Sequence, residues 1–213
     1  GLDLPGGKTF AFLLEALLAV TPEGHRLRIG SIEPEYVTPA VIAQLDHPRL
    51  AQHLHLPLQG TTDEVLCAMG RPNRVADYED LIHTIRRNSP DIALGADVIA
   101  GYPTEADALF REGLLWLEKL PLSYLHVFPF SARPATPAWA LPSLAPDEVK
   151  ERARLMREVG ARKHRAFLAR WVGKRTRVVP ERRTPEGIVG TSGPFFVVTV
   201  GGSEQLDSGP PVC

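Results

Sequence analysis

The stretch Ile92-Ala93-Leu94-Gly95-Ala96-Asp97-Val98-Ile99-Ala100-Gly101, followed by Tyr102-Pro103-Thr104-Glu105, has the pattern of a buried strand that ends in a glycine turn and leads into a helix. Three other strand-like runs end in a polar or glycine-bearing turn. They are Ile29-Gly30-Ser31-Ile32-Glu33-Pro34, His53-Leu54-His55-Leu56-Pro57-Leu58-Gln59-Gly60 and Leu125-His126-Val127-Phe128-Pro129-Phe130-Ser131-Ala132-Arg133-Pro134. In a parallel α/β sheet, ligands bind at the carboxyl ends of the strands. The residues that we expect to face one pocket are therefore Glu33, Gln59, Gly101 with Glu105, and Ser131 with Arg133.

Helix-like and strand-like segments alternate up to the fourth of these turns. Apolar periodicity predicts helices over 8–19, 38–45 and 75–85, and two more that begin near Thr62 and Glu105. Apolar runs predict parallel strands near 27–32, 53–58, 92–99 and 123–130. The predicted fold class is α/β, with four β/α units joined by right-handed crossovers. Four units are half of an eight-unit barrel, so we expect further N-terminal units in a longer parent protein.

The composition is that of an ordinary globular protein. The chain has 213 residues, of which 44% are hydrophobic and 23% charged, enough for one domain with a good core and a small appendage. No apolar run approaches the ~20 residues of a membrane span, so we expect no membrane partner. Cys67 and Cys213 lie far apart and make no disulfide framework, which favours a cytoplasmic protein. The chain opens on Gly1, without an initiator Met or a secretory signal, which is typical of a fragment.

The pattern changes after Ser131. A proline-rich loop leads to Pro146-Asp147-Glu148, which predicts a helix start, and Gly173 is a plausible C′ residue at the far end. Residues 176–179 and 195–200 are strand-like and predict a small all-β module. We therefore expect a partial (β/α) barrel over residues 1–145, a basic connecting helix over 146–173, and a partial β module with a tail over 174–213.

Positive charge gathers in one segment of the chain. From Lys150 to Arg183 there are 13 Lys or Arg and three acids, whereas the remainder holds 11 basic and 22 acidic residues. This asymmetry indicates contact with a polyanion such as RNA, although a solvated, Arg-rich helix face has the same composition. The residues that we expect to contact RNA are Arg162, Lys163, Arg165, Lys174, Arg175 and Arg177.

The four turns, in their order and spacing, resemble those of the radical S-adenosylmethionine methylthiotransferases. The resemblance rests on Ser31-Ile32-Glu33-Pro34, on the run from His53 to Gln59, on the run from Asp97 to Glu105, and on Phe130-Ser131-Ala132-Arg133-Pro134-Ala135-Thr136-Pro137. It covers roughly residues 8–180. The run from Leu122 to Ser131, together with Met69-Gly70-Arg71, makes the chain most similar to the branch that acts on threonylcarbamoyladenosine in tRNA.

This resemblance implies the C-terminal half of a partial TIM barrel that binds S-adenosylmethionine, followed by a tRNA-binding β module of the TRAM type. The parent would be a cytoplasmic enzyme that transfers a methylthio group to C2 of N6-threonylcarbamoyladenosine in tRNA by radical chemistry, with [4Fe–4S] clusters as further cofactors. Glu33 and Gln59 would lie near the ribose and methionyl parts, the Ile99–Gly101 backbone near the adenine, and Arg133 against an anionic group. The expected S-adenosylmethionine ligands are Ser31, Glu33, Gln59, Asp97, Ile99, Gly101 and Arg133.

The chain departs from the family in its cysteines. A radical cluster is held by three closely spaced cysteines, and the sequence has no such trio. We therefore expect no cluster ligand, no metal site and no catalytic residue in this chain, and no activity from it alone. Cys67 lies in an apolar helical stretch, which predicts a buried structural thiol. Gly60-Thr61-Thr62 stands where the family usually has Ser-Gly-Ser.

Two other interpretations remain open from the residues. A noncatalytic RNA-binding α/β protein would use the basic helix alone. A TIM-barrel metallohydrolase would use the His-x-His pair of one strand with acids and histidines of others, namely His53, His55, Asp97 and His126. Glu33 before Pro34 is also compatible with a turn cap. Phe10, Phe12, Trp116 and Leu117 are predicted core residues, and Phe195-Phe196 is predicted to pack in a strand rather than stack on bases.

Overall fold

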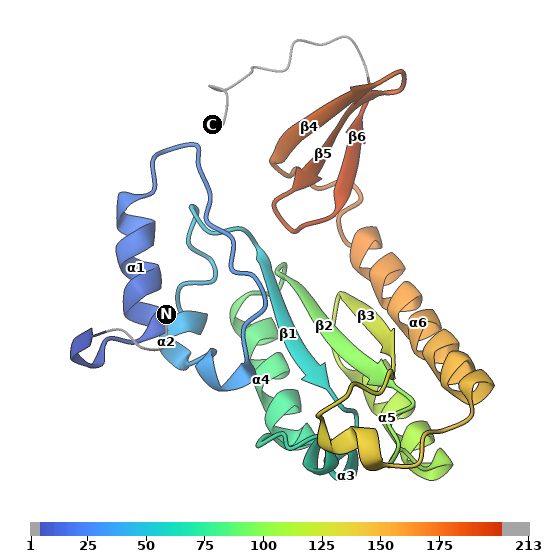
Figure 1. Cartoon of the computed structure of the whole chain (residues 1–213). Coiled ribbons are helices and arrows are strands. Elements are labelled where there is room, and N and C mark those ends of the chain that lie inside the picture. The colour runs from blue at the N-terminus through green and yellow to red at the C-terminus, as the bar shows by residue number, and fades with distance from the viewer. Residues whose placement is uncertain (1–4, 202–213) are drawn as a thin grey trace.

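A computed structural model of the chain describes residues 5–201. Figure 1 shows a parallel sheet with helices behind and beside it, and a second, smaller sheet at the far end of a long helix. The helices are α1 (Phe10–Val20), α2 (Pro39–Ile42), α3 (Asp63–Ala68), α4 (Val75–Asn88), α5 (Asp107–Lys119) and α6 (Pro146–Ala169). The strands are β1 (His53–Gln59), β2 (Ala93–Ala100), β3 (Tyr124–Pro129), β4 (Val178–Thr184), β5 (Gly187–Ser192) and β6 (Val197–Val200). Short 3₁₀ turns span Pro5–Gly7, Pro34–Tyr36 and Pro137–Ala140.

The first sheet has the order β1-β2-β3, and both strand pairs are parallel, which confirms the predicted α/β class. Alternation along each strand gives the sheet two different faces. Leu54, Leu56 and Leu58 of β1 are fully buried in the core, together with every second residue of β2 from Leu94 to Ala100. Apolar side chains of α4, α5 and α6 complete this core. The opposite face carries the other set of side chains, and in Figure 1 no helix within residues 5–201 covers it.

The prediction of a strand over 27–32, the first of the four, is wrong. This segment runs beside β1 but makes only two isolated parallel bridges, Leu27 with Leu50 and Ser31 with His55. The two bridges differ in register by one residue, so a continuous ladder between the segments cannot form. The segment after Leu50 takes up the extra residue in a tight turn, where the His53 N–H donates to the Ala51 carbonyl at 2.7 Å.

The helices largely follow the predicted pattern, but one predicted core residue of α1 is exposed. Helix α1 begins after Thr9, whose side chain accepts the Phe12 N–H at 3.3 Å, and α3 begins after Thr62, which caps the Val65 N–H in the same way. Phe12 is 47% exposed, so the prediction that it is a core residue is wrong. It lies on the outer side of α1 with Leu17 and Val20, which are also exposed.

Among residues 5–201, no helix combines the length and the apolar character that a bilayer span requires.

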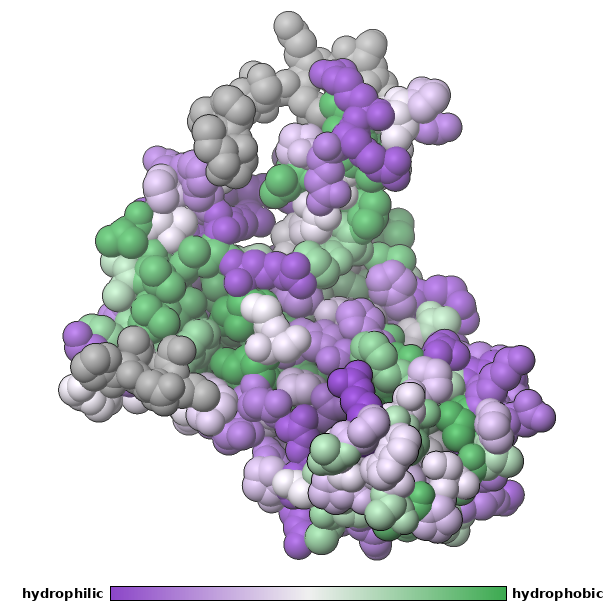
Figure 2. All heavy atoms as spheres, viewed as in Figure 1, coloured by the Kyte–Doolittle hydropathy of each residue, from purple (hydrophilic) through white to green (hydrophobic). Residues whose placement is uncertain are grey.

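The second sheet is antiparallel, with the order β4-β5-β6. Gly173 lies just after α6 with φ 79°, the left-handed conformation expected of a C′ glycine. Strand β5 was not predicted, and β6 begins only at Val197, so Phe195 and Phe196 precede the strand rather than pack within it. Hydrophilic side chains gather over this sheet in Figure 2, in keeping with the exposed residues of β4.

Aromatic residues join the second sheet to the rest of the molecule. The Phe195 ring lies 3.5 Å from the Arg28 guanidinium carbon and 4.4 Å from the His53 ring, so it covers the first residue of β1. Phe196 packs against Phe167 and Trp171 at the end of α6. The turn between β5 and β6 therefore contacts the first sheet through Phe195 and the end of α6 through Phe196.

Candidate functional site

The uncovered face of the parallel sheet is lined by polar and aromatic side chains. They alternate with the buried core residues and come from all three strands: His53, His55, Asp97, Tyr124, His126 and Phe128, with the aliphatic Ile99 among them. Their shared face follows from the period of two along each strand and from the parallel register, in which Asp97 is the direct partner of His126.

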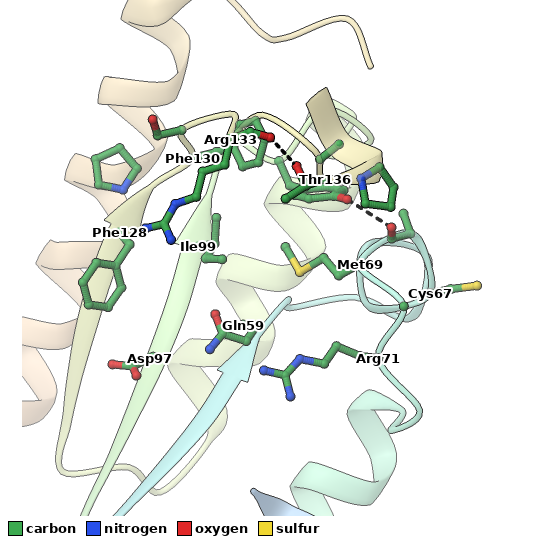
Figure 3. Close-up of a pocket in the computed structure, with 17 residues that line it drawn as sticks. Gln59, Cys67, Met69, Arg71, Asp97, Ile99, Phe128, Phe130, Arg133 and Thr136 are labelled. Atoms are coloured by element: carbon green, nitrogen blue, oxygen red, sulfur yellow. Dashed lines mark hydrogen bonds between the residues drawn. The ribbon is translucent and has the colours of Figure 1, made fainter. Parts of the chain in front are cut away.

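A cavity of about 760 Å³ lies at the carboxyl ends of the three strands. Figure 3 shows side chains entering it from β1, β2, β3 and the loops that follow them. The lining is mixed in character, with apolar Ile99, Tyr102, Phe128 and Phe130 beside polar or charged residues. Its position agrees with the rule that α/β proteins bind ligands where strands end and loops converge.

Four of the seven expected cofactor ligands line this cavity: Gln59, Asp97, Ile99 and Arg133. Ser131, from the same turn as Arg133, lines it too. Glu33 lies outside the lining but forms an ion pair with the cavity residue Arg71, at 2.6 Å from Nη1 to Oε2. Ser31 is exposed beside β1, and Gly101 lies buried beneath the turn after β2. The binding roles of all seven residues stay predictions.

Residues from three further segments complete the cavity and were not predicted. The stretch from Cys67 to Arg71 spans the end of α3 and the turn after it, and Tyr102 and Thr136–Ala138 come from the turns after β2 and β3. Cys67 is exposed, so the prediction of a buried thiol is wrong. Helix α3 has only six residues, and Val65 and Leu66 fill its buried side, which leaves Cys67 on the outer side. In Figure 3 its sulfur points away from Gln59 and Asp97.

The turn after β2 is held by a buried ion pair. Gly101 has φ 79°, and its N–H donates to the Glu105 carboxylate at 2.8 Å. Arg152 of α6 donates to the same Glu105 oxygen at 3.0 Å, and both side chains are at most 4% exposed. A Cβ at position 101 would lie 2.8 Å from Val149 of α6, so only glycine fits there without displacement. Helix α6 thus stabilises the turn at the end of β2, where Gly101 and Glu105 lie.

A chain of hydrogen bonds crosses the uncovered face from β1 to β3. Arg28 Nε lies 3.5 Å from His53 Nδ1, His53 Nε2 lies 2.7 Å from the Tyr124 hydroxyl, and that hydroxyl lies 3.0 Å from His55 Nδ1. His55 Nε2 then lies 2.9 Å from Asp97 Oδ1. Burial lowers the pKa of His53 to about 4, with a further contribution from the Arg28 charge. Burial also lowers the pKa of His55, and Asp97 opposes that shift.

The six expected RNA contacts fall into two groups. Arg162 pairs with Glu118, the Lys163 amine donates to the Glu118 and Leu120 carbonyls, and Lys174 pairs with Asp91. Burial lowers the pKa of Lys163 to about 8. The second group, Arg165, Arg175 and Arg177, is exposed and takes part in no ion pair within residues 5–201. RNA binding by either group stays a prediction.

Comparison with known proteins gives sequence relatives and a shared fold. No protein-family model matches the chain. It is 32% identical over 182 residues to the threonylcarbamoyladenosine tRNA methylthiotransferase MtaB of Rickettsia prowazekii, an alignment that covers 85% of this chain and 43% of that protein. It is 34% identical over 202 residues to the tRNA-2-methylthio-N(6)-dimethylallyladenosine synthase of Nitrosospira multiformis, covering 92% and 42%. The archaeal Elp3 of Methanocaldococcus infernus superposes with a TM-score of 0.52 at 11% identity, over 79% of this chain and 53% of that one.

The parallel sheet, with its helices on one face and a cavity at its carboxyl ends, places the chain in the α/β class and gives it the fold of the archaeal Elp3 structure. By sequence the chain is a relative of the tRNA methylthiotransferases, which confirms the resemblance predicted from its four turns. It spans less than half the length of these curated relatives. The comparisons favour neither the noncatalytic RNA-binding protein nor the metallohydrolase.

Proposed function

We propose that this chain is the S-adenosylmethionine- and tRNA-binding part of a cytoplasmic enzyme that transfers a methylthio group to C2 of N6-threonylcarbamoyladenosine in tRNA. The observation that carries the proposal is the cavity at the strand ends, which gathers Gln59, Asp97, Ile99 and Arg133 in a relative of the tRNA methylthiotransferases. The choice of the threonylcarbamoyl base rests on the names of four relatives at 32–37% identity.

The cavity residues fit S-adenosylmethionine in size and chemistry. A volume of about 760 Å³ lies within the usual range for small-molecule sites. Ile99, Phe128 and Phe130 offer apolar surface to an adenine ring, and Gln59 offers donors and acceptors to a ribose or an amino-acid group. Arg133 supports the proposal as a partner for a carboxylate. Bound beside an iron–sulfur cluster, this cofactor supplies the radical chemistry of the class.

The residues of this chain do not fit an iron–sulfur cluster. Such a cluster takes three or four cysteine thiolates, and the sequence contains two cysteines, Cys67 and Cys213. The Cys67 sulfur points away from Gln59 and Asp97 (Figure 3), and Cys213 lies outside the described residues. We therefore assign the clusters to other segments of the parent protein and expect this chain alone to be inactive.

The proposal is tested by grafting. This chain replaces the matched region of the Rickettsia prowazekii relative, and the chimera is expressed in a bacterial strain that lacks the corresponding modification. Mass spectrometry of digested tRNA should then show 2-methylthio-N6-threonylcarbamoyladenosine. The chimera carrying Arg133→Ala should lose most of the product, whereas Arg111→Ala, on the exposed side of α5, should keep it.

Two outcomes would contradict the proposal. One is a folded chimera that leaves the tRNA unmodified, and the other is a product on the dimethylallyl base instead of the threonylcarbamoyl base. Cofactor binding is measured separately by equilibrium dialysis of radiolabelled S-adenosylmethionine against the chain and its Gln59→Ala and Arg133→Ala variants. Unchanged affinity in both variants would argue against their assigned roles.

A further inference from the structure

Three potential metal ligands converge on the uncovered face of the parallel sheet. His55 of β1, Asp97 of β2 and His126 of β3 each offer one ligand atom, and these atoms all lie within 4.8 Å of one another. His55 Nε2 lies 2.9 Å from Asp97 Oδ1, and His126 Nδ1 lies 3.3 Å from the same oxygen. Three adjacent strands therefore supply two imidazole nitrogens and one carboxylate oxygen to a single point.

Two of the three separations between the ligand atoms suit a shared ion, and the third is at most 4.8 Å. Ligand atoms about 2.0–2.2 Å from a tetrahedral Zn²⁺ lie roughly 3.3 Å from one another. The His126–Asp97 contact already has this length, and the His55–Asp97 contact is a few tenths of an ångström shorter. Two histidines with one carboxylate are the ligand set of many zinc and non-haem iron sites that keep open positions.

The exposure of the three side chains indicates where the free coordination positions of a bound ion would lie. The His55 side chain is 7% exposed and that of Asp97 is 21%, whereas the His126 side chain is 57% exposed. Asp97 also lines the cavity at the strand ends. A bound ion would thus have protein on the β1 side and free coordination positions toward solvent and the cavity.

Tyr124 supplies the orienting contact that a metal-binding histidine needs. Its hydroxyl lies 3.0 Å from His55 Nδ1, which directs Nε2 toward Asp97. The Tyr124 ring reaches His55 by crossing β2 above Gly95, where an added Cβ would overlap the ring. Glycine at this position therefore makes room for the Tyr124 ring, whose hydroxyl contacts His55.

We propose that His55, Asp97 and His126 bind one divalent first-row transition-metal ion, with Tyr124 as the residue that orients His55. This site is distinct from the iron–sulfur clusters of the proposed function and does not depend on that function. The alternative to a metal site is a cluster of hydrogen bonds without metal, in which His55 Nε2–H donates to Asp97.

The experiment titrates the untagged chain with Zn²⁺ by calorimetry and with Co²⁺ by visible absorption. We expect one equivalent to bind and a Co²⁺ spectrum of nitrogen and oxygen ligands. His126→Ala and Asp97→Asn should abolish saturable binding, because each removes one of three ligands. Tyr124→Phe keeps all three ligands and should weaken binding about 10- to 100-fold, the usual effect of losing an orienting partner.

Two controls exclude other ligands. His83→Ala removes an exposed histidine on α4, outside the site, and Cys67→Ser removes the exposed thiol, so both should bind metal like the parent chain. Circular dichroism checks that each variant is folded, and the exposed position of His126 makes its replacement the mildest of the set. The proposal is overturned if the parent shows no saturable binding, or if folded His126→Ala and Asp97→Asn chains bind as the parent does.

Discussion

Gln59 ends β1 in a left-handed backbone conformation, with φ 67°. Residues with a Cβ rarely adopt this conformation, and strain of this kind costs about 1–3 kcal/mol and is concentrated at ligand sites. The strained residue lies at a register shift between Pro57 and Gln59, where the regular pairing of β1 with β2 is interrupted. The Gln59 side chain thereby reaches the cavity.

We predict that Gln59→Gly raises the free energy of unfolding by about 1 kcal/mol relative to Gln59→Ala, because glycine adopts this backbone conformation without strain. Both variants should bind S-adenosylmethionine more weakly than the parent, since both lose the amide. Urea denaturation measures the first effect and equilibrium dialysis the second. Equal stability of the two variants would mean that the backbone at this position carries no strain.

His53 gives the fold a dependence on pH. Burial lowers its pKa from 6.5 to about 4 in the folded protein, so below pH 6.5 the unfolded chain takes up a proton before the folded one does. The free energy of unfolding should therefore fall as the pH drops from 6.5 to 4, by up to about 3 kcal/mol from this residue. Above pH 6.5 this contribution is fully present.

The measurement is urea denaturation at several pH values for the parent, His53→Gln and His83→Gln. His53→Gln should have a flatter profile between pH 6.5 and 4, because glutamine does not titrate. His83 is about half exposed on α4 and serves as the control, whose profile should match that of the parent. A parent and a His53→Gln variant with parallel profiles would argue against a neutral, buried His53.

At the scale of elements, α6 has one buried charged contact with the turn after β2. Arg152 donates to Glu105, whose carboxylate also accepts the Gly101 N–H, and Glu148 contacts the same guanidinium from one turn away. Removing one partner of a buried ion pair leaves an uncompensated charge, which typically costs about 3–5 kcal/mol. An exposed pair typically contributes less than about 1 kcal/mol.

We predict that Arg152→Met lowers the free energy of unfolding by about 3 kcal/mol or more, whereas Arg154→Met, on the exposed side of the same helix, leaves it nearly unchanged. The double variant Arg152→Met, Glu105→Gln should recover part of the loss, because no unpaired charge remains. Thermal and urea denaturation give the three values. A double variant less stable than Arg152→Met alone would contradict this account.

The main elements could be predicted because their signals are local. Apolar periodicity marks α1, α4, α5 and α6, and the apolar runs of β1, β2 and β3 need no knowledge of their partners. The segment over 27–32 has the same apolar character, but its strand is lost through a one-residue difference in register with 50–55. Strand β5 has glycines at 187 and 190, which weaken a strand signal, and it exists because β4 and β6 pair with it.

The candidate site was predictable to a similar degree. Turns at strand ends marked Gln59, Ser131 and Arg133 because parallel strands end at one edge, whereas Asp97 and Ile99 were expected from the family resemblance. Tyr102 and Thr136 enter the cavity from loops whose path depends on tertiary packing. The convergence of His55, Asp97 and His126 depends on the register of β1 against β2 and β3, which the sequence pattern does not contain.

At the scale of the whole molecule, positive charge continues from the end of α6 into the second sheet. Arg162, Lys163 and Lys174 already contact Glu118, Leu120 and Asp91, so their replacement would alter folding as well as RNA binding. Arg165, Arg175 and Arg177 are exposed and give a cleaner test. Contacts between such cations and phosphates release counterions and carry little base information.

We predict that the variant Arg165→Ala, Arg175→Ala, Arg177→Ala binds many RNAs more weakly and flattens the dependence of log K on log salt by up to ~0.9 per lost duplex phosphate contact. The measurement is a salt titration of tRNA binding for this variant and the parent chain. Replacing Lys119, Arg87 and Arg111 gives a control of equal charge on α4 and α5, which should leave the slope unchanged. Identical slopes for parent and test variant would mean that these arginines are only a solvated surface.

The contact of Phe195 with His53 makes this histidine a reporter for the position of the second sheet. His53 is 1% exposed beneath the Phe195 ring, whereas the His126 side chain, two strands away on the same face, is 57% exposed. An acylating reagent such as diethyl pyrocarbonate should therefore modify His126 readily and leave His53 intact. Phe195→Ala should make His53 reactive, and so should any bound RNA that draws the second sheet away from β1. The extent of acylation of His53 relative to His126, measured by peptide mass spectrometry, thus reports whether the two sheets have moved apart.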